Sequence, residues 1–154
     1  MSYITGERLA EAQVVQVEGF NSKNVGRGTK WKWLNSGNSD HYAVLRKGPH
    51  TEPFITLRIK DKKYRTIIEV IQRVSTGENQ TLEDNYDALL QYTDNIITRL
   101  DAYYQFADTA NTIRDANVTG GDEVKEIWIR DTLAWIKVEV FLDWSEDATI
   151  TFAE

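Results

Sequence analysis

The fold is decided by the alternation WIKVEVFLDW, residues 135–144 of the 154-residue chain. Its even-numbered positions, from Ile136 to Trp144, are all apolar, whereas charged residues occur only among the odd-numbered ones. Successive side chains of a β-strand point to opposite faces of a sheet, so a period of two predicts a strand with one buried face. We expect this strand to run from residue 127 to residue 144.

A helical pattern precedes this strand. Apolar side chains recur there at steps of three and four residues, which places them on one face of a helix. They are Leu82, Tyr86, Leu89, Leu90, Ile96, Ile97, Leu100, Tyr103 and Tyr104. The pattern predicts one long helix over about 82–106, roughly 37 Å in length and sufficient to cross a sheet face. A short helix is predicted over 6–17 with Thr5 as its N-cap, followed by a turn-rich segment that Phe20 and Val25 anchor to the body.

The other strands are predicted from runs of β-branched and aromatic residues between turn formers. These runs are 31–34, 41–46, 54–59, 64–74, 112–118 and 148–152. Residues 54–59 and 64–74 are expected to form a hairpin across the charged residues 60–63. The sequence therefore predicts a single α+β domain, 1–154, in which the long helix and the short N-terminal helix pack on a mainly antiparallel sheet.

The composition favours a folded intracellular domain. Hydrophobic residues make up 41% of the chain and include 5 Trp, 7 Tyr and 5 Phe, enough for a core without metals or cross-links. The absence of cysteine excludes disulfides and thiolate chemistry. Charged residues interrupt every apolar run, so we expect no membrane-spanning helix. Residues 1–8 lack the basic and apolar segments of a secretory signal, which favours an intracellular location.

Charge is distributed unevenly along the chain. Residues 1–75 contain 13 Lys/Arg and 7 Asp/Glu, whereas residues 76–154 contain 5 and 17. The two parts therefore carry net charges of +6 and −12. Two outcomes remain open at this point: the charges cancel where the parts interleave in the fold, or basic and acidic faces of different copies attract each other.

The sequence contains no recognisable catalytic residues, cofactor motif or metal site. The two histidines, His41 and His50, are too few for a multi-histidine site and lie on different predicted elements. The acids within 143–147 are expected to form a solvated turn rather than a cation site. Residues 26–28 lack the third glycine of a dinucleotide motif. The basic and aromatic run 30–33 is expected to be a strand with buried tryptophans, although such a run also suits phosphate contact and base stacking.

Two exposed segments are predicted to contact partners. Residues 47–53 contain both prolines of the chain, which favours an extended, exposed loop. Residues 148–152 are expected to pair as a last edge strand, in the same chain or on a neighbouring subunit. The candidate interface residues are Lys47, Gly48, Pro49, His50, Pro53, Ile150 and Phe152.

Several loose patterns follow the short N-terminal helix in a characteristic order. They are Phe20…Asn24-Val25, the strand and loop 42–48, the strand 64–74, the helix with Asn85, Tyr86, Ile96 and Leu100, and the closing strand 135–144. In their order and spacing, over most of the chain, these patterns resemble the tail terminator proteins of long-tailed bacteriophages, also called minor tail or tail-completion proteins. The patterns are individually unspecific, so the resemblance implies architecture better than partners.

The resemblance implies a structural virion protein without enzymatic activity or cofactor. Copies of the chain, in a ring expected to be hexameric, would cap the head-proximal end of the tail tube, end its growth and join it to the head. The implied partners are further copies, the tail tube protein and a head-completion or connector protein. DNA would pass through the bore without sequence-specific binding, and an acidic lumen would let it slide. The implied location is the neck region of the virion, after assembly in the host cytoplasm.

Other functions remain open from the sequence. A head-completion or stopper protein of the neck is also a ring, and the sequence hardly distinguishes it from a tail terminator. A small enzyme or ligand-binding α+β domain would need a cleft, for which the strand 31–34 offers the aromatic wall. A nucleic-acid regulator would show binding that weakens steeply with salt.

Overall fold

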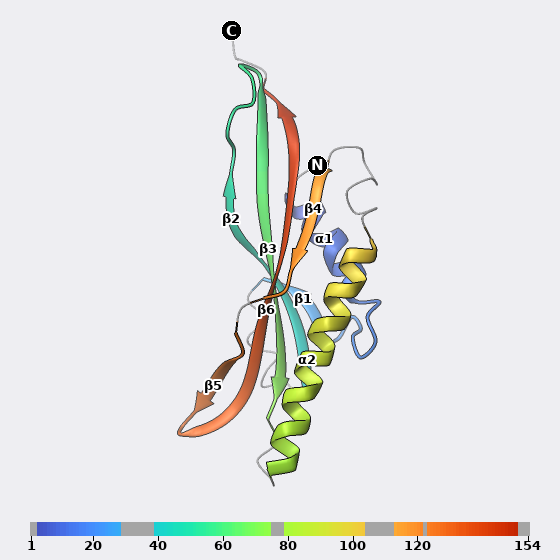
Figure 1. The fold of residues 1–154 in the computed structure, drawn as a ribbon, viewed down its shortest axis with the longest axis vertical. Coiled ribbons are helices and arrows are strands. Elements are labelled where there is room, and N and C mark those ends of the chain that lie inside the picture. The colour runs from blue at the N-terminus through green and yellow to red at the C-terminus, as the bar shows by residue number, and fades with distance from the viewer. Residues whose placement is uncertain (1–2, 29–38, 75–78, 104–112, 122, 151–154) are drawn as a thin grey trace.

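A computed structural model describes residues 3–28, 39–74, 79–103, 113–121 and 123–150 (Figure 1). In chain order the elements are α1 (Tyr3–Val14), β1 (Val25–Arg27), β2 (His41–Thr51), β3 (Ile59–Arg73), α2 (Asn79–Ala102), β4 (Ile113–Thr119), β5 (Lys125–Ile129) and β6 (Thr132–Thr149). The fold is α+β, with a mostly antiparallel sheet and two helices in the described part of the chain, as predicted. Neither of these helices is long and apolar enough to span a membrane.

The centre of the sheet is the antiparallel pair β3 and β6. The strand order is β1-β2-β3-β6-β4, and β5 pairs with β6 as well. The β3–β6 register runs without interruption from Ile59 opposite Thr149 to Arg73 opposite Trp135. On its other edge β6 pairs with β5 near its beginning and with β4 near its end. Only β1 is parallel to its neighbour, β2. The strand that the alternation predicted is therefore central.

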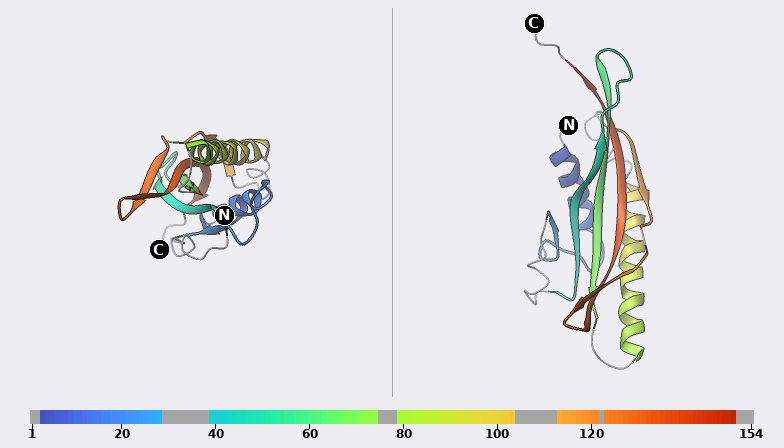
Figure 2. Two further views of the ribbon diagram at one scale, coloured as in Figure 1. Left: turned by 90° about the horizontal axis from the view of Figure 1, so that it is seen from below. Right: turned by 90° about the vertical axis from the view of Figure 1, so that its left-hand side faces the viewer.

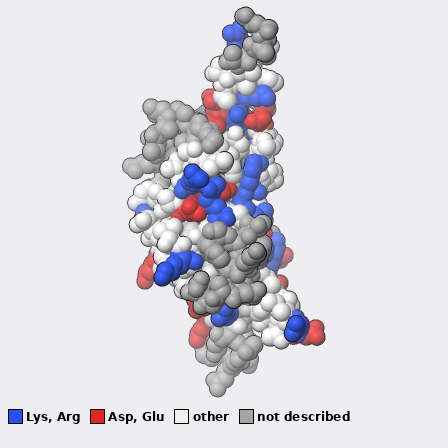
Figure 3. Space-filling view, turned by 180° about the vertical axis from the view of Figure 1, so that it is seen from behind, with Lys and Arg blue, Asp and Glu red and all other residues white. Residues whose placement is uncertain are grey.

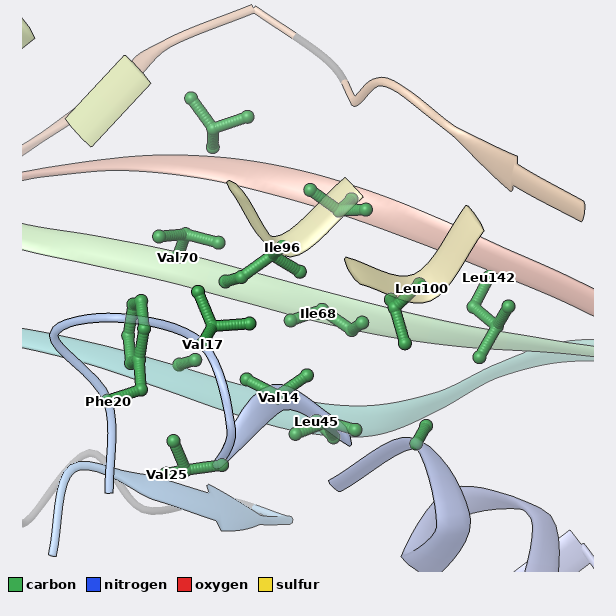
Figure 4. Packing of buried hydrophobic residues seen from close by; sticks show 14 of the residues in the cluster. Val14, Val17, Phe20, Val25, Leu45, Ile68, Val70, Ile96, Leu100 and Leu142 are labelled. Carbon is green, nitrogen blue, oxygen red and sulfur yellow. The ribbon is translucent and has the colours of Figure 1, made fainter. Parts of the chain in front are cut away.

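One face of the sheet carries the main core. Its β6 residues are the even-numbered positions from Ile136 to Trp144, all buried, as the alternation predicted. Both helices contribute to the same cluster, so both cover this face, around which the sheet curves (Figure 2). Figure 4 shows Ile96 of α2 among these side chains. Phe20 and Val25 also belong to the cluster, which confirms their predicted role as anchors.

Helix α1 lies close against the sheet at Gly6. A Cβ atom added to Gly6 would lie 2.5 Å from the ring of Trp144, so the helix packs directly on the indole. The predicted range 6–17 is shifted, because α1 begins at Tyr3 and ends at Val14. Thr5 therefore lies within the first turn of the helix and does not cap it. The physical reason is tertiary: the Tyr3 ring packs on Trp144, 5.9 Å between ring centroids, which extends the helix towards the N-terminus.

Helix α2 begins three residues before the predicted start and ends at Ala102. Its predicted stripe is only partly buried: Leu89, Ile96 and Leu100 are in the core, whereas Leu82, Tyr86 and Leu90 are exposed. Leu82 lies seven residues before Leu89 and therefore on nearly the same side of the helix, but it is exposed near the beginning of the helix. Tyr86 and Leu90 lie progressively further from the core side, because steps of four residues drift around the axis. Of the predicted helix 82–106, residues 104–106 lie outside the described residues, as does the predicted strand 31–34.

The strands differ from the prediction at the prolines. Strand β2 continues to Thr51, so 47–51 are strand rather than loop, and the β2–β3 register shifts between Lys47 and His50. This irregularity admits Pro49, because a proline is tolerated at a bulge or on a sheet edge. The predicted hairpin across 60–63 is wrong, since β3 runs continuously through these residues and Phe54 forms only an isolated bridge with Lys60. The long partner β6 supplies backbone hydrogen bonds along this segment whatever its side chains are.

The predicted strand 127–144 is two strands. A turn at Arg130 and Asp131, with φ of 49° and 65°, separates β5 from β6. Positive φ at both central residues suits the tight turn of a two-residue hairpin, where Asn and Gly are the usual signals. Strand β6 then continues to Thr149, so 148 and 149 are not a separate strand. They pair with β3 of the same chain, Ala148 opposite Lys60, which is one of the two pairings that were predicted.

Candidate interaction surface

The candidate interface residues lie towards one end of the molecule. The ends of β2, β3 and β6 project beyond both helices, and we call residues 48–63 and 145–150 the arm (Figure 1). Gly48, Pro49, His50 and Pro53 belong to the arm, and Lys47 lies at its base. The backbone N–H of Ile150 donates to the carbonyl oxygen of Arg58 over 2.6 Å, which brings the end of β6 to the same place. Phe152 lies outside the described residues.

Stacked aromatic rings form the base of the arm. The ring of Tyr64 lies 4.5 Å from Trp144 and 5.6 Å from Tyr3, between ring centroids. His50 stacks on Tyr64 at 5.7 Å, and Lys47 Nζ donates to His50 Nδ1 over 2.7 Å. Two predicted interface residues, Lys47 and His50, thus hold the arm to the body.

Buried hydrogen bonds fix α1 beneath these rings. The Tyr3 hydroxyl donates to Glu7 Oε2 over 2.6 Å and lies 3.2 Å from Thr66 Oγ1. Arg27 Nε donates to the other oxygen of Glu7, also over 2.6 Å, so the buried carboxylate is paired with a cation. Burial and the hydrogen bond to Glu7 raise the pKa of Tyr3 above its ordinary value. The α1 helix is thereby tied to both β1 and β3.

The tip of the arm is apolar and exposed. Phe54, Ile55 and Leu57 have exposed fractions of 59%, 53% and 88%, and we call these three side chains the tip patch. Lys60 Nζ lies 5.0 Å from the centre of the Phe54 ring, so a cation borders the patch. The sequence interpretation missed the tip patch, because it treated 54–59 as a strand. The available signal was an apolar run that directly follows Pro53 and is followed by the basic residues Arg58 and Lys60.

A shallow groove of about 380 Å³ lies beside the arm. It is lined by Pro49, His50, Thr51, Lys63, Tyr64, Arg65, Asn117, Asp143, Trp144 and Ser145. Arg65 donates two hydrogen bonds to the carboxylate of Asp143, over 2.8 and 3.1 Å, and this contact raises the pKa of Arg65. Lys63 forms an ion pair with Asp61 at 3.6 Å. The charged side chains of Lys63, Arg65 and Asp143 in the groove are therefore paired with each other or with neighbouring residues. Such pairing favours a structural role over acid–base catalysis.

The two histidines are on one strand, β2, rather than on different elements as expected. His41 stacks on Tyr92 at 4.3 Å and contacts the Asp40 carboxylate at 2.6 Å and the Gly19 carbonyl, all at the end of β2 that is remote from the arm. The acids within 143–147 lie on β6 and not in a turn. Across the described residues no group of three or more His, Asp and Glu is placed to hold a metal ion.

The charge asymmetry is partly cancelled within the sheet. On the face opposite the helices, Arg46 lies 2.5 Å from Glu69 and 3.4 Å from Glu139, and the hydrogen bond to Glu69 raises the pKa of Arg46. Lys137 lies 3.7 Å from Glu139. Arg46–Glu139 and Arg65–Asp143 join the basic first part of the chain to the acidic second part, whereas Arg46–Glu69 and Lys137–Glu139 pair charges within one part. Figure 3 shows basic side chains beside acidic ones on the face that it presents.

Acidic charge remains concentrated on α2. The helix contains Glu83, Asp84, Asp87, Asp94 and Asp101 against a single basic residue, Arg99. Arg99 lies over the ring of Tyr103 at 4.1 Å and donates to Gln13 of α1 over 3.3 Å, so it faces α1. The charged side chains in the N-terminal part of α2, Glu83, Asp84 and Asp87, are thus all acidic.

Comparison with known proteins gives no family assignment. No protein-family model matches the sequence, and a search of curated proteins finds no match.

Proposed function

We propose that this protein is a structural subunit of a ring, expected to be hexameric, at the head-proximal end of a bacteriophage tail tube. In this role it is not an enzyme and needs no cofactor. The ring ends the growth of the tube and joins the tail to the head connector in the neck of the virion. Its partners are neighbouring copies, the tail tube protein and a head-completion or connector protein, and DNA passes through the bore without sequence-specific contacts.

The observation that carries the proposal is the arm. A β-arm that projects beyond the helices, with Leu57 at its tip 88% exposed, presents apolar surface that water does not favour. Exposed apolar patches of this kind mark contacts with other proteins. At the aromatic base Tyr64 contacts both Trp144 and His50, and these contacts favour one orientation of the arm. An arm that holds an exposed apolar surface in one place suits protein assembly better than catalysis.

The charge distribution also supports a ring. A head-to-tail interface closes into a ring when each copy presents two different, complementary surfaces. The acidic N-terminal part of α2 and the basic residues near the tip patch are two such surfaces on one chain. The remaining acidic charge would keep DNA from adhering to the ring.

Negative-stain microscopy of the purified chain, alone and with tail tubes, tests this proposal. We expect rings of one size, seated at one end of the tubes. Rings that leave tubes bare and bind the portal of filled heads would instead identify a head-completion or stopper protein. Absence of rings in both samples would contradict the proposal.

A further inference from the structure

Two of the exposed apolar patches that the described residues form lie at opposite ends of the molecule. One is the tip patch on the arm. The other is formed by Leu82, Tyr86 and Leu90 near the beginning of α2, and we call these three side chains the α2 stripe. The arm projects at one end of the molecule, whereas the beginning of α2 lies at the other end (Figures 1 and 2).

The α2 stripe has the geometry of a docking surface. Its residues follow each other at intervals of four, so they lie on one side of the helix. Tyr86 is 45% exposed, whereas Leu89, three residues further on, is fully buried in the core. The beginning of the helix therefore leaves three apolar side chains open, on and beside the side that the core covers further along. An open apolar face on a helix is the surface that a partner covers.

Charge complementarity identifies the occupant as a second copy. Glu83 and Asp87 are exposed one position along from Leu82 and Tyr86, and within the described residues no ion pair engages them. The tip patch is bordered instead by Arg58 and Lys60. An apolar patch with a basic rim thus faces outward at one end of the chain, and an apolar stripe with an acidic rim at the other. Opposite charges on the two rims favour this pairing and oppose tip-to-tip or stripe-to-stripe contact.

We propose that the tip patch of one copy docks on the α2 stripe of the next copy, with Arg58 and Lys60 beside Glu83 and Asp87. The inference rests on the proposed function, because this contact links neighbours in the ring. Its two surfaces differ, so the contact is heterologous and continues from copy to copy until the ring closes.

Chemical cross-linking tests the contact directly, because the chain contains no cysteine of its own. Leu57→Cys and Tyr86→Cys are made on differently tagged full-length chains, which are mixed and treated with a short bismaleimide. We expect a mixed-tag dimer in high yield. The matched control replaces Tyr86→Cys with Trp128→Cys, at an apolar residue of β5 that is 57% exposed against 45% for Tyr86, and should give only background. Equal yields from the two pairs would overturn the inference.

Charge exchange gives an independent readout. The double variant Arg58→Glu, Lys60→Glu should weaken association about ten-fold or more, since like charges then face each other across the contact. Adding Glu83→Lys and Asp87→Lys should restore it. All these side chains are on the surface, so the melting temperature of the folded chain serves as the control for folding. Loss of association without restoration would contradict the pairing of the two rims.

The outcomes separate this inference from the proposed function. If native mass measurement shows a ring but the Leu57–Tyr86 pair cross-links no better than the control, the ring stands and this contact is wrong. If Leu57→Cys links only to added tail tube protein or to a connector protein, the tip patch serves that partner instead, and the inference is again overturned. A chain that stays monomeric with tail tubes present contradicts both proposals.

Discussion

The base and the tip of the arm both contain large apolar side chains, but these side chains are largely buried at the base and exposed at the tip. At the base, the rings of Tyr64, Trp144 and Tyr3 contact one another, and Trp144 is almost fully buried. At the tip, Phe54 and Leu57 are mostly exposed. The comparison shows that an apolar side chain contributes to the stability of the single chain only where a second element covers it. The base should therefore determine folding, and the tip should determine association.

The largest effect is expected at the base. Trp144→Ala removes an indole that contacts α1 and Tyr64, and should lower the free energy of unfolding by about 3–5 kcal/mol. Chemical denaturation measures this change. The matched control, Trp128→Ala on the exposed hairpin, should change stability by only about 0.5 kcal/mol. Similar losses for the two tryptophans would mean that the base is not packed as described.

Tyr3→Phe tests the polar side of the base. The substitution leaves the buried Glu7 carboxylate without the 2.6 Å hydrogen bond from Tyr3, and should cost about 1.5–3 kcal/mol at neutral pH.

The same variant has a characteristic pH dependence. Burial and the hydrogen bond to Glu7 raise the pKa of Tyr3, so the folded chain keeps a proton that the unfolded chain releases above about pH 10. This stabilisation is complete below pH 10 and falls as the pH rises further. Tyr64 and Tyr92, whose pKa values burial also raises, act alike in both proteins. Urea denaturation from pH 7 to 11 should show a shallower alkaline loss for Tyr3→Phe, and parallel curves would refute this assignment.

Gly6→Ala tests the close contact of α1 with the sheet. Alanine favours a helix by about 1 kcal/mol over glycine, but its Cβ would lie 2.5 Å from the Trp144 ring. Overpacking should prevail and give a net loss of about 1–2 kcal/mol. At Gly120 the nearest atom to an added Cβ is 3.8 Å away, so Gly120→Ala is the control and should be nearly neutral in thermal melting. A stabilising Gly6→Ala would show that the helix can move away from Trp144.

The smallest effect on stability is expected at the tip, where the effect on association is large. Leu57 contacts little of its own chain, so Leu57→Asp should change the free energy of unfolding by no more than about 0.5 kcal/mol. Association of copies should nevertheless fall about ten-fold or more, because a charge replaces an apolar anchor. Sedimentation velocity measures this. If the variant assembles like the wild-type chain, the tip patch has no role in association.

Much of the fold is readable from the sequence because burial imposes a period. The alternation from Ile136 to Trp144 and the repeat around Leu89, Ile96 and Leu100 both correspond to buried faces. The turn at Arg130 and Asp131 is not readable, because arginine rarely adopts positive φ and no glycine or asparagine marks the turn. The continuity of β3 across 60–63 is not readable either, since it depends on β6, which is remote in sequence.

The candidate site is readable only in outline. Of the predicted interface residues, Pro49, Pro53 and Ile150 lie in the arm, whereas Lys47 and His50 contribute to the contacts at its base. The tip patch and the α2 stripe could not be predicted from the sequence. An apolar pattern indicates which side of a helix or strand is apolar, but it does not show whether another element covers that side. Leu82 and Leu89 look alike in sequence, and only the position of the sheet separates the exposed residue from the buried one.

Native mass measurement of the purified chain, over a range of concentration and salt and with tail tube protein added, shows whether copies of the chain form a ring. We expect a single closed oligomer, a hexamer, that weakens when Leu57 is changed to Asp. A monomer under all of these conditions would contradict it.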